Sequence, residues 1–112
     1  MTKIGQFAAT PGGFAGRIRT LTLDAQLRIV DADSGEGENT PDYRIMFGEA
    51  ADAIEVGAGW KRVGEKAGNY VSLAIDDPSL IQPIHANLFQ SGSDPDAHIL
   101  LWNRPSKRKQ RD

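Results

Sequence analysis

The chain has 112 residues, of which 39% are hydrophobic and none is cysteine, and its formal net charge is -2 at pH 7. A chain of this length predicts one domain that buries a single core, and the lack of cysteine excludes disulfide bonds and thiolate metal sites. The first residues do not have the pattern of a secretory signal, and no apolar run approaches the ~20 residues needed to cross a bilayer. We therefore expect a cytoplasmic protein that does not enter a membrane.

Charge is distributed unevenly along the chain. From Arg104 to Asp112 there are five cations and one carboxylate, so this end carries +4 and residues 1–103 carry -6. Between Asp31 and Glu55, eight carboxylates accompany one cation, Arg44. We expect an all-β domain over residues 1–104, followed by a flexible basic tail over residues 105–112 that contacts nucleic acid only through non-specific charge. The cations of this tail are Lys107, Arg108, Lys109 and Arg111.

Short segments with alternating apolar and polar residues follow one another along the chain, and turn residues separate them. Alternation with period two predicts strands that bury one face, and no window sustains the helical period of 3.6. In chain order the expected strands occupy residues 4–9, 14–23, 27–30, 43–47, 54–61, 70–75, 84–89 and 97–102. The sequence therefore predicts seven or eight short antiparallel strands.

Some connections between these segments carry specific signals. A proline and two glycines between the first two segments predict a β-hairpin. Within the second segment Ile18 has the opposite parity to Leu21 and Leu23, so we expect a bulge or a barrel corner near Thr20. Residues 34–41 are polar and rich in glycine, which predicts a mobile loop.

An antiparallel sheet of this size closes on itself or stacks on a second sheet, because either arrangement hides its edge strands. We therefore expect a single small barrel or sandwich with meander or Greek-key connections. Gly57 and Gly59 alternate within one expected strand, which indicates a curved strand or the close approach of another backbone. Trp60 shares parity with Val56, and Trp102 shares parity with Leu100, so both indoles are expected in the core.

The residues that catalysis requires do not converge in this sequence. The two histidines, His85 and His98, are each expected to be structural or solvent-facing, since no triad pattern surrounds them. The adjacent Asp76 and Asp77 could form an acid/base pair or bind a hard cation, but the proline and serine that follow favour a turn. The glycine pairs do not precede helices, as phosphate-binding loops do. We expect no catalytic residue, metal or cofactor, and hence a binding protein.

Cations and an aromatic ring suited to single-stranded nucleic acid occur on several expected strands. Arg17 and Arg19 share one face of the second segment, and Lys61 and Arg62 follow the glycine-bearing strand. Tyr70 has the opposite parity to the apolar residues of its strand, so its ring is expected to be available for base stacking. We hypothesise that these five residues form one binding face. The competing interpretation is that the two arginines of the second segment pair with carboxylates on adjacent strands.

Several ordered blocks of the chain resemble one bacterial family. They are Gly16–Leu21, Pro41–Arg44, Glu55–Lys61, Leu73–Ser79, Pro83–Leu88 and the closing Leu101–Trp102. Over residues 4–104 the chain is similar to the family called domain of unknown function 736. This resemblance implies a small cytoplasmic bacterial protein, encoded near plasmid and integrative-element genes, with no assigned catalytic activity.

Two functions of different classes are open from the sequence. The first is a mobile-element accessory protein that binds single-stranded nucleic acid. The alternative is a protein-interaction or regulatory module that pairs through a sheet edge or an acidic face, which the charge of -6 on residues 1–103 favours. The sequence does not specify the oligomeric state.

Overall fold

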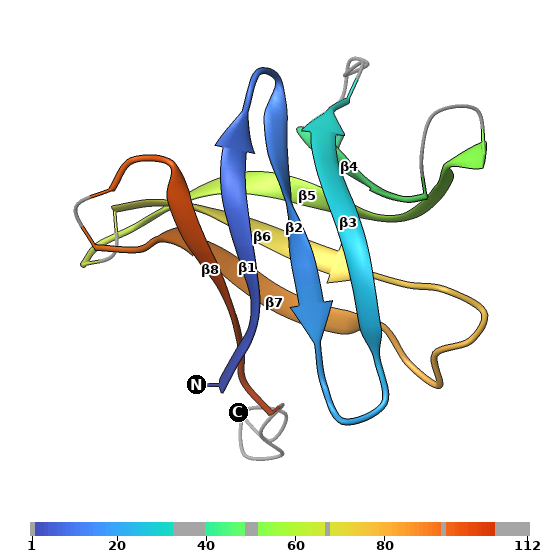
Figure 1. The fold of residues 1–112 in the computed structure, drawn as a ribbon. Coiled ribbons are helices and arrows are strands. Elements are labelled where there is room, and N and C mark those ends of the chain that lie inside the picture. Colours follow the sequence, from blue (N-terminus) through green and yellow to red (C-terminus); the bar gives the residue numbers. More distant parts are fainter. Residues whose placement is uncertain (1, 33–39, 49–51, 67, 93, 105–112) are drawn as a thin grey trace.

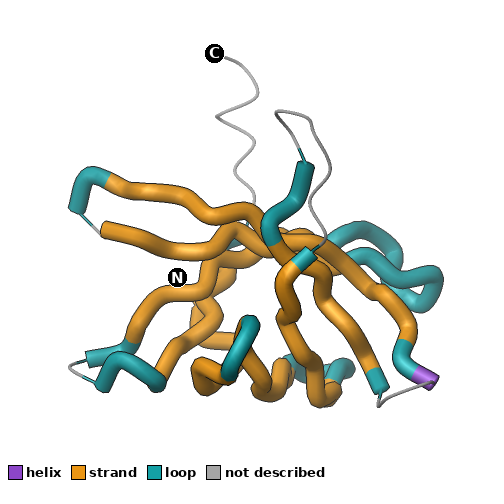
Figure 2. Tube along the Cα trace, turned by 90° about the horizontal axis from the view of Figure 1, so that it is seen from above, coloured by secondary structure: helices purple, strands orange, loops and turns teal. Residues whose placement is uncertain are grey.

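The computed structural model describes residues 2–32, 40–48, 52–66, 68–92 and 94–104. Its described part consists of strands and short connections, and the one helical position is a 3₁₀ residue, Asp52 (Figure 2). The strands are β1 (Thr2–Thr10), β2 (Gly13–Arg19), β3 (Asp24–Asp31), β4 (Tyr43–Phe47), β5 (Ile54–Gly64), β6 (Gly68–Ile75), β7 (Ile84–Gln90) and β8 (Ala97–Trp102). The prediction of an all-β domain with about eight short strands is confirmed.

The eight strands form a closed antiparallel barrel. Each strand pairs with the next one along the chain, and β8 pairs back with β1. In Figure 1, β1, β2 and β3 run side by side, while β5, β6 and β7 cross behind them. The connections are those of a meander. Because every strand has two neighbours, the described sheet has no free edge strand.

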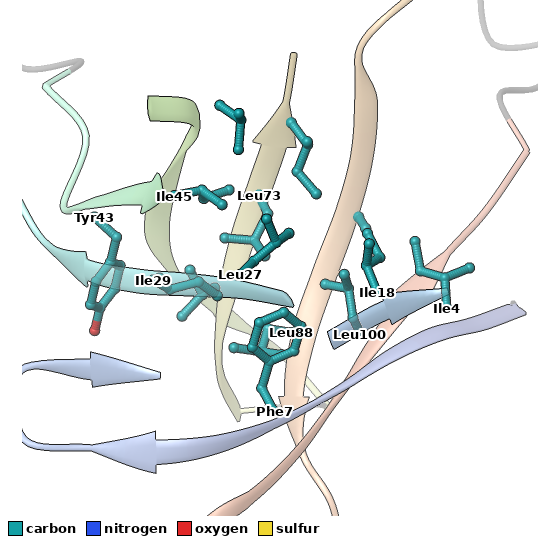
Figure 3. Close-up of a cluster of buried hydrophobic side chains, with 14 residues drawn as sticks. Ile4, Phe7, Ile18, Leu27, Ile29, Tyr43, Ile45, Leu73, Leu88 and Leu100 are labelled. Carbon is teal, nitrogen blue, oxygen red and sulfur yellow. The ribbon is translucent and has the colours of Figure 1, made fainter. Parts of the chain in front are cut away.

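The core lies inside the barrel, and each strand contributes at least one buried side chain to it. The period-two alternation of apolar residues explains this, since it directs every second side chain inward. The largest side chains that are less than 2% exposed are Ile18, Ile29, Ile45, Leu73, Leu88 and Leu100. In Figure 3 the buried side chains gather into one cluster, with Tyr43 near one end and Ile4 near the other.

The second strand ends earlier than the sequence predicts. β2 ends at Arg19, and residues 20–23 form the turn into β3 rather than a bulge within a longer strand. The Oγ1 atom of Thr20 accepts hydrogen bonds from the backbone N–H groups of Thr22 and Leu23, at 3.3 and 3.1 Å. A turn held by a threonine hydroxyl needs neither proline nor glycine. The expected bulge or barrel corner near Thr20 is therefore wrong, because the change of parity marks a chain reversal between β2 and β3.

A bulge in β5 reverses the orientation of the residues that follow it. The β4–β5 pairing shifts register around Val56, which is buried. Beyond this bulge Gly57 and Gly59 face the interior, because they pair with inward-facing residues of β4 and β6. Trp60 consequently lies on the outer face and is half-buried, so its expected place in the core is wrong. Trp102 is also half-buried, but it packs against the core as expected.

Two predicted turns are present. The hairpin between β1 and β2 turns through residues 11–12, and Gly12 has a positive φ of 87° that favours glycine. After β6, the carboxylate of Asp77 accepts hydrogen bonds from the backbone N–H and the hydroxyl of Ser79. Most of the loop expected over residues 34–41, and the whole tail over residues 105–112, lie outside the described residues. In the described part of the chain, no helix has the length and hydropathy that a membrane crossing requires.

Candidate nucleic-acid interface

Arg17 and Arg19 lie on the outer face of β2, and both approach Asp24 on β3. Arg17 donates hydrogen bonds from Nε and Nη2 to the two carboxylate oxygens, at 2.6 and 2.8 Å, and Arg19 Nε lies 3.9 Å from the carboxylate. The hydrogen bonds from Arg17 lower the pKa of Asp24 below its ordinary value of 3.8. The pairing of these arginines with a carboxylate is thereby confirmed, and it reduces the positive charge that β2 offers to a phosphate.

Lys61 and Arg62 point to opposite sides of β5. Lys61 pairs with the inward-facing Val71, and its Nζ atom lies 5.7 Å from the centre of the Tyr43 ring. Arg62 pairs with Tyr70 across the β5–β6 ladder, on the outer face. In the barrel, β3 and β4 separate β2 from β5. The five residues predicted as one binding face are therefore divided: Arg17 and Arg19 lie together on β2, whereas Arg62 and Tyr70 form a pair on the outer face of β5 and β6. Lys61 lies on the other side of β5 but lines one hollow with that pair.

An aromatic cluster surrounds this pair on the outer face of the barrel. The ring of Tyr70 stacks on that of Phe89 in β7, with centroids 5.1 Å apart and planes inclined by 29°. Trp60 has the same outward parity as Arg62 and lies two residues before it on β5. The three aromatic residues are half-buried, so each side chain remains partly accessible to solvent. Among the described residues, Arg62 forms no ion pair.

We call this surface the stacking face and define it by the residues of β5–β8 that face outward beyond the bulge in β5; Glu55, which faces outward before the bulge, lies 3.9 Å from Arg44 and is not part of it. They are Ala58, Trp60, Arg62, Tyr70, Ser72, Ala74, His85, Asn87, Phe89, Ile99 and Leu101. None of these side chains is acidic, although residues 1–103 carry a net charge of -6. The ladder continues from Leu101 to Lys3 on β1, which places a second cation at the border of the face. The face thus combines aromatic rings, hydroxyl and amide groups and two cations, and the nearby carboxylate of Glu55 is paired with Arg44.

Of the residues in this cluster, Tyr70 and Arg62 are predicted from the sequence, whereas Trp60 and Phe89 are not. A usable signal existed for Phe89, because it follows the buried Leu88 and must therefore face outward. No such signal existed for Trp60. Its orientation depends on the bulge around Val56, and simple alternation along the strand gives the opposite face.

Among the described residues, the histidines and acids do not assemble into a reactive centre. His85 is exposed, whereas His98 is half-buried, with Nδ1 3.3 Å from the backbone oxygen of Asp96 and its ring edge-on to Phe14. Hydrogen bonds from Ser79 lower the pKa of Asp77, and its carboxylate stabilises the turn that contains both residues. In the residues that the structure describes, no group of three or more potential metal-binding side chains comes together.

The fold and this surface define a small closed meander barrel with an aromatic outer face. The family model described as "Protein of unknown function (DUF736)" matches residues 3–105, and the chain therefore belongs to that family. A search of curated proteins and a search of solved structures each found no match to the chain. The family description names no activity or ligand, so function has to be inferred from the chain's own surfaces.

Proposed function

We propose that this barrel is a non-enzymatic binding protein for single-stranded nucleic acid, and that the strand lies across the stacking face. The observation that carries the proposal is the grouping of Trp60, Tyr70 and Phe89 with Arg62 on the outer face of β5–β7, where no acidic residue lies among them. Stacking of a base on an aromatic side chain contributes about 1–3 kcal/mol and tolerates any base. A strand that stacks on two or three of these rings would bind without a fixed sequence.

The charge distribution favours single strands over duplexes. In a duplex the bases stack on one another, and their faces are not available to protein side chains. Duplex binding then depends on cations that neutralise phosphates, and the stacking face offers only Arg62 and, at its border, Lys3. Arg17 and Arg19 add little, because Asp24 already pairs with them.

An accessory role in plasmids or integrative elements is part of the same proposal, and the family resemblance supports it. The alternative function is a protein-interaction module. Pairing of a partner through a sheet edge is disfavoured, because the closed ladder leaves no free edge among the described strands. The acidic-face form of this module involves residues 31–55, part of which lie outside the described residues. Association of two copies through the stacking face is an outcome that the test below distinguishes.

Fluorescence anisotropy with a labelled oligothymidine tests the proposal, using a chain that ends at Arg104 so that the basic tail is absent. Tyr70→Ala is expected to weaken binding by roughly 1–3 kcal/mol, which is about five- to 150-fold, because one stacking platform is lost. Phe47→Ala is the matched control. Phe47 is 44% exposed and lines a different hollow of the barrel, so its loss should leave the affinity unchanged.

The salt dependence gives a second, independent readout. With phosphate contacts from Lys3 and Arg62 only, the slope of log affinity against log salt should be close to -1.4 for the shortened chain, at about -0.7 per contact. Arg62→Gln should reduce this slope by about half, and Arg19→Gln should not change it. The proposal is wrong if the shortened chain does not bind oligonucleotides at low salt. It is also wrong if Tyr70→Ala converts a dimer to a monomer without changing oligonucleotide affinity, because the face is then a protein interface.

A further inference from the structure

A hollow of about 540 Å³ opens at one end of the barrel and meets the stacking face at Arg62 and Tyr70. An eight-stranded barrel is just wide enough to be filled by side chains or to hold one small ligand at its end. Ligand pockets commonly have volumes of about 300–1,000 Å³. We call this hollow the aromatic mouth and define it by six of its lining residues. They are Phe14, Tyr43, Lys61, Asn69, Gln90 and His98.

Three rings form the inner wall of the aromatic mouth. Phe14 packs edge-to-face against Tyr43, with centroids 5.9 Å apart, and against His98, with centroids 4.8 Å apart. Tyr43 is buried and belongs to the core cluster, near one end of it (Figure 3). Phe14 and His98 are half-buried. The wall is therefore anchored in the core, and its outer part presents an aromatic surface against which a planar ring can lie.

Polar groups that suit an anion lie at the rim. Lys61 is exposed, its Nζ stands over the Tyr43 ring, and it forms no ion pair among the described residues. Arg62 also lines the hollow, and Asn69 and Gln90 are exposed and bring amide groups from β6 and β7. No carboxylate belongs to the lining. Asp42, in the loop before β4, instead accepts a hydrogen bond from the backbone N–H of Lys61 at 2.8 Å.

We propose that the aromatic mouth binds a nucleoside monophosphate. The base lies against the ring wall, the phosphate contacts Lys61, and the amides of Asn69 and Gln90 hydrogen-bond the base edge or the sugar. Two sources supply this chemistry, a free mononucleotide and the phosphorylated end of a single strand. The inference rests on the lining of the mouth and stands even if the stacking face binds nothing, although Arg62 and Tyr70 border both surfaces.

Amide chemical shifts measured by NMR test the inference on the whole chain. Titration with each of the four nucleoside 5′-monophosphates should give saturable shifts at Lys61, Asn69, Gln90 and His98. The matching nucleoside without phosphate should bind roughly tenfold more weakly, since a charge-assisted contact is lost. Lys61→Gln should show the same loss. Because Lys61 is exposed, this substitution is expected to leave the fold intact, and the thermal midpoint verifies it. A separate substitution, Phe14→Leu, removes one ring of the wall and tests whether the wall contributes to binding.

Arg17→Gln is the matched control, because it removes a cation from β2 that does not line the mouth. It should leave mononucleotide binding unchanged. The inference is overturned if none of the four mononucleotides gives saturable shifts at millimolar concentration, or if Lys61→Gln binds as tightly as the parent chain.

The two sources are separated with a 5′-phosphorylated linear oligonucleotide and the same oligonucleotide closed into a circle. Shifts at the aromatic mouth with the linear form but not with the circle support recognition of a strand end. Shifts with mononucleotides alone support a free nucleotide. Equal shifts with the linear form and the circle overturn the inference, because the mouth then contacts the interior of a strand. Binding of the circle that depends on Tyr70 but does not reach the mouth would retain the proposed function of the stacking face.

Discussion

Gly57 illustrates at the residue scale how closely neighbouring strands approach in this barrel. A Cβ atom at this position would lie 2.2 Å from the backbone oxygen of Ala74 and 3.0 Å from Cδ1 of Ile45. A backbone carbonyl within a ladder cannot move aside without disturbing its neighbours, so Gly57→Ala should destabilise the fold by about 1–3 kcal/mol. Gly59→Ala should cost less, because its closest contact is a side-chain atom, Cδ2 of Leu73 at 2.8 Å.

Urea denaturation of both alanine variants checks this order of stability. The midpoint for Gly57→Ala should fall below that for Gly59→Ala, with unchanged slopes if the compactness of the two states is preserved. Equal midpoints for the two variants and the parent chain would contradict the prediction, because they would show that a Cβ atom is accommodated at both positions.

The carboxylate of Asp24 provides a pH-dependent contribution to stability. Hydrogen bonds from Arg17 hold its pKa below the ordinary value of 3.8 in the folded state. A lowered folded-state pKa stabilises the fold above the ordinary value, and this stabilisation is lost as the pH falls through the lowered one. We expect Asp24→Asn to lower the melting temperature at neutral pH and to match the parent chain in strong acid. Melting curves over this range check the prediction, and a difference that persists in acid would contradict it.

At the scale of elements, the sequence predicts the strands better than it predicts their faces. Strong alternation places β4 and β8 at residues 43–47 and 97–102, as observed. The end of β2 is misplaced because a threonine turn lacks the usual turn residues. The orientation of Trp60 is misplaced because a one-residue bulge reverses every later side chain of β5. The prediction of the candidate site is the least accurate. Arg17 and Arg62 lie on β2 and β5, which β3 and β4 separate, and the sequence alone does not show this arrangement.

β8 completes the barrel, and its central residue should be sensitive to truncation. Leu100 is 0% exposed and lies between Leu88 of β7 and Gly5 of β1. Leu100→Ala should destabilise the protein by about 2–5 kcal/mol, because it removes buried contacts and leaves a cavity. Ile81→Ala is the control, since Ile81 is 103% exposed and its loss should change stability by less than about 0.5 kcal/mol. Similar unfolding free energies for the two variants would argue against closure through β8.

Over the whole molecule, closure of the barrel brings the two ends of the described chain together. Thr2 of β1 pairs with Trp102 of β8, so the first and last strands are hydrogen-bonded neighbours (Figure 1). The interior is filled by residues from all eight strands, and the stability of the fold depends on this complete ring of ladders. The stability of the fold should therefore depend less on the order of the strands along the chain than on their pairing in space.

A circular permutant tests this dependence on pairing. Joining Arg104 to Thr2 through roughly four to six glycine and serine residues, and opening the chain between the exposed Ile81 and Gln82, keeps all eight ladders intact. We expect the same all-β circular dichroism spectrum and a melting temperature within a few degrees of the parent chain. A second permutant, opened between Asn87 and Leu88, divides β7 at a side chain that is only 1% exposed and should not fold. If both permutants fold equally well, or if neither does, stability does not reside in the closed ring of ladders.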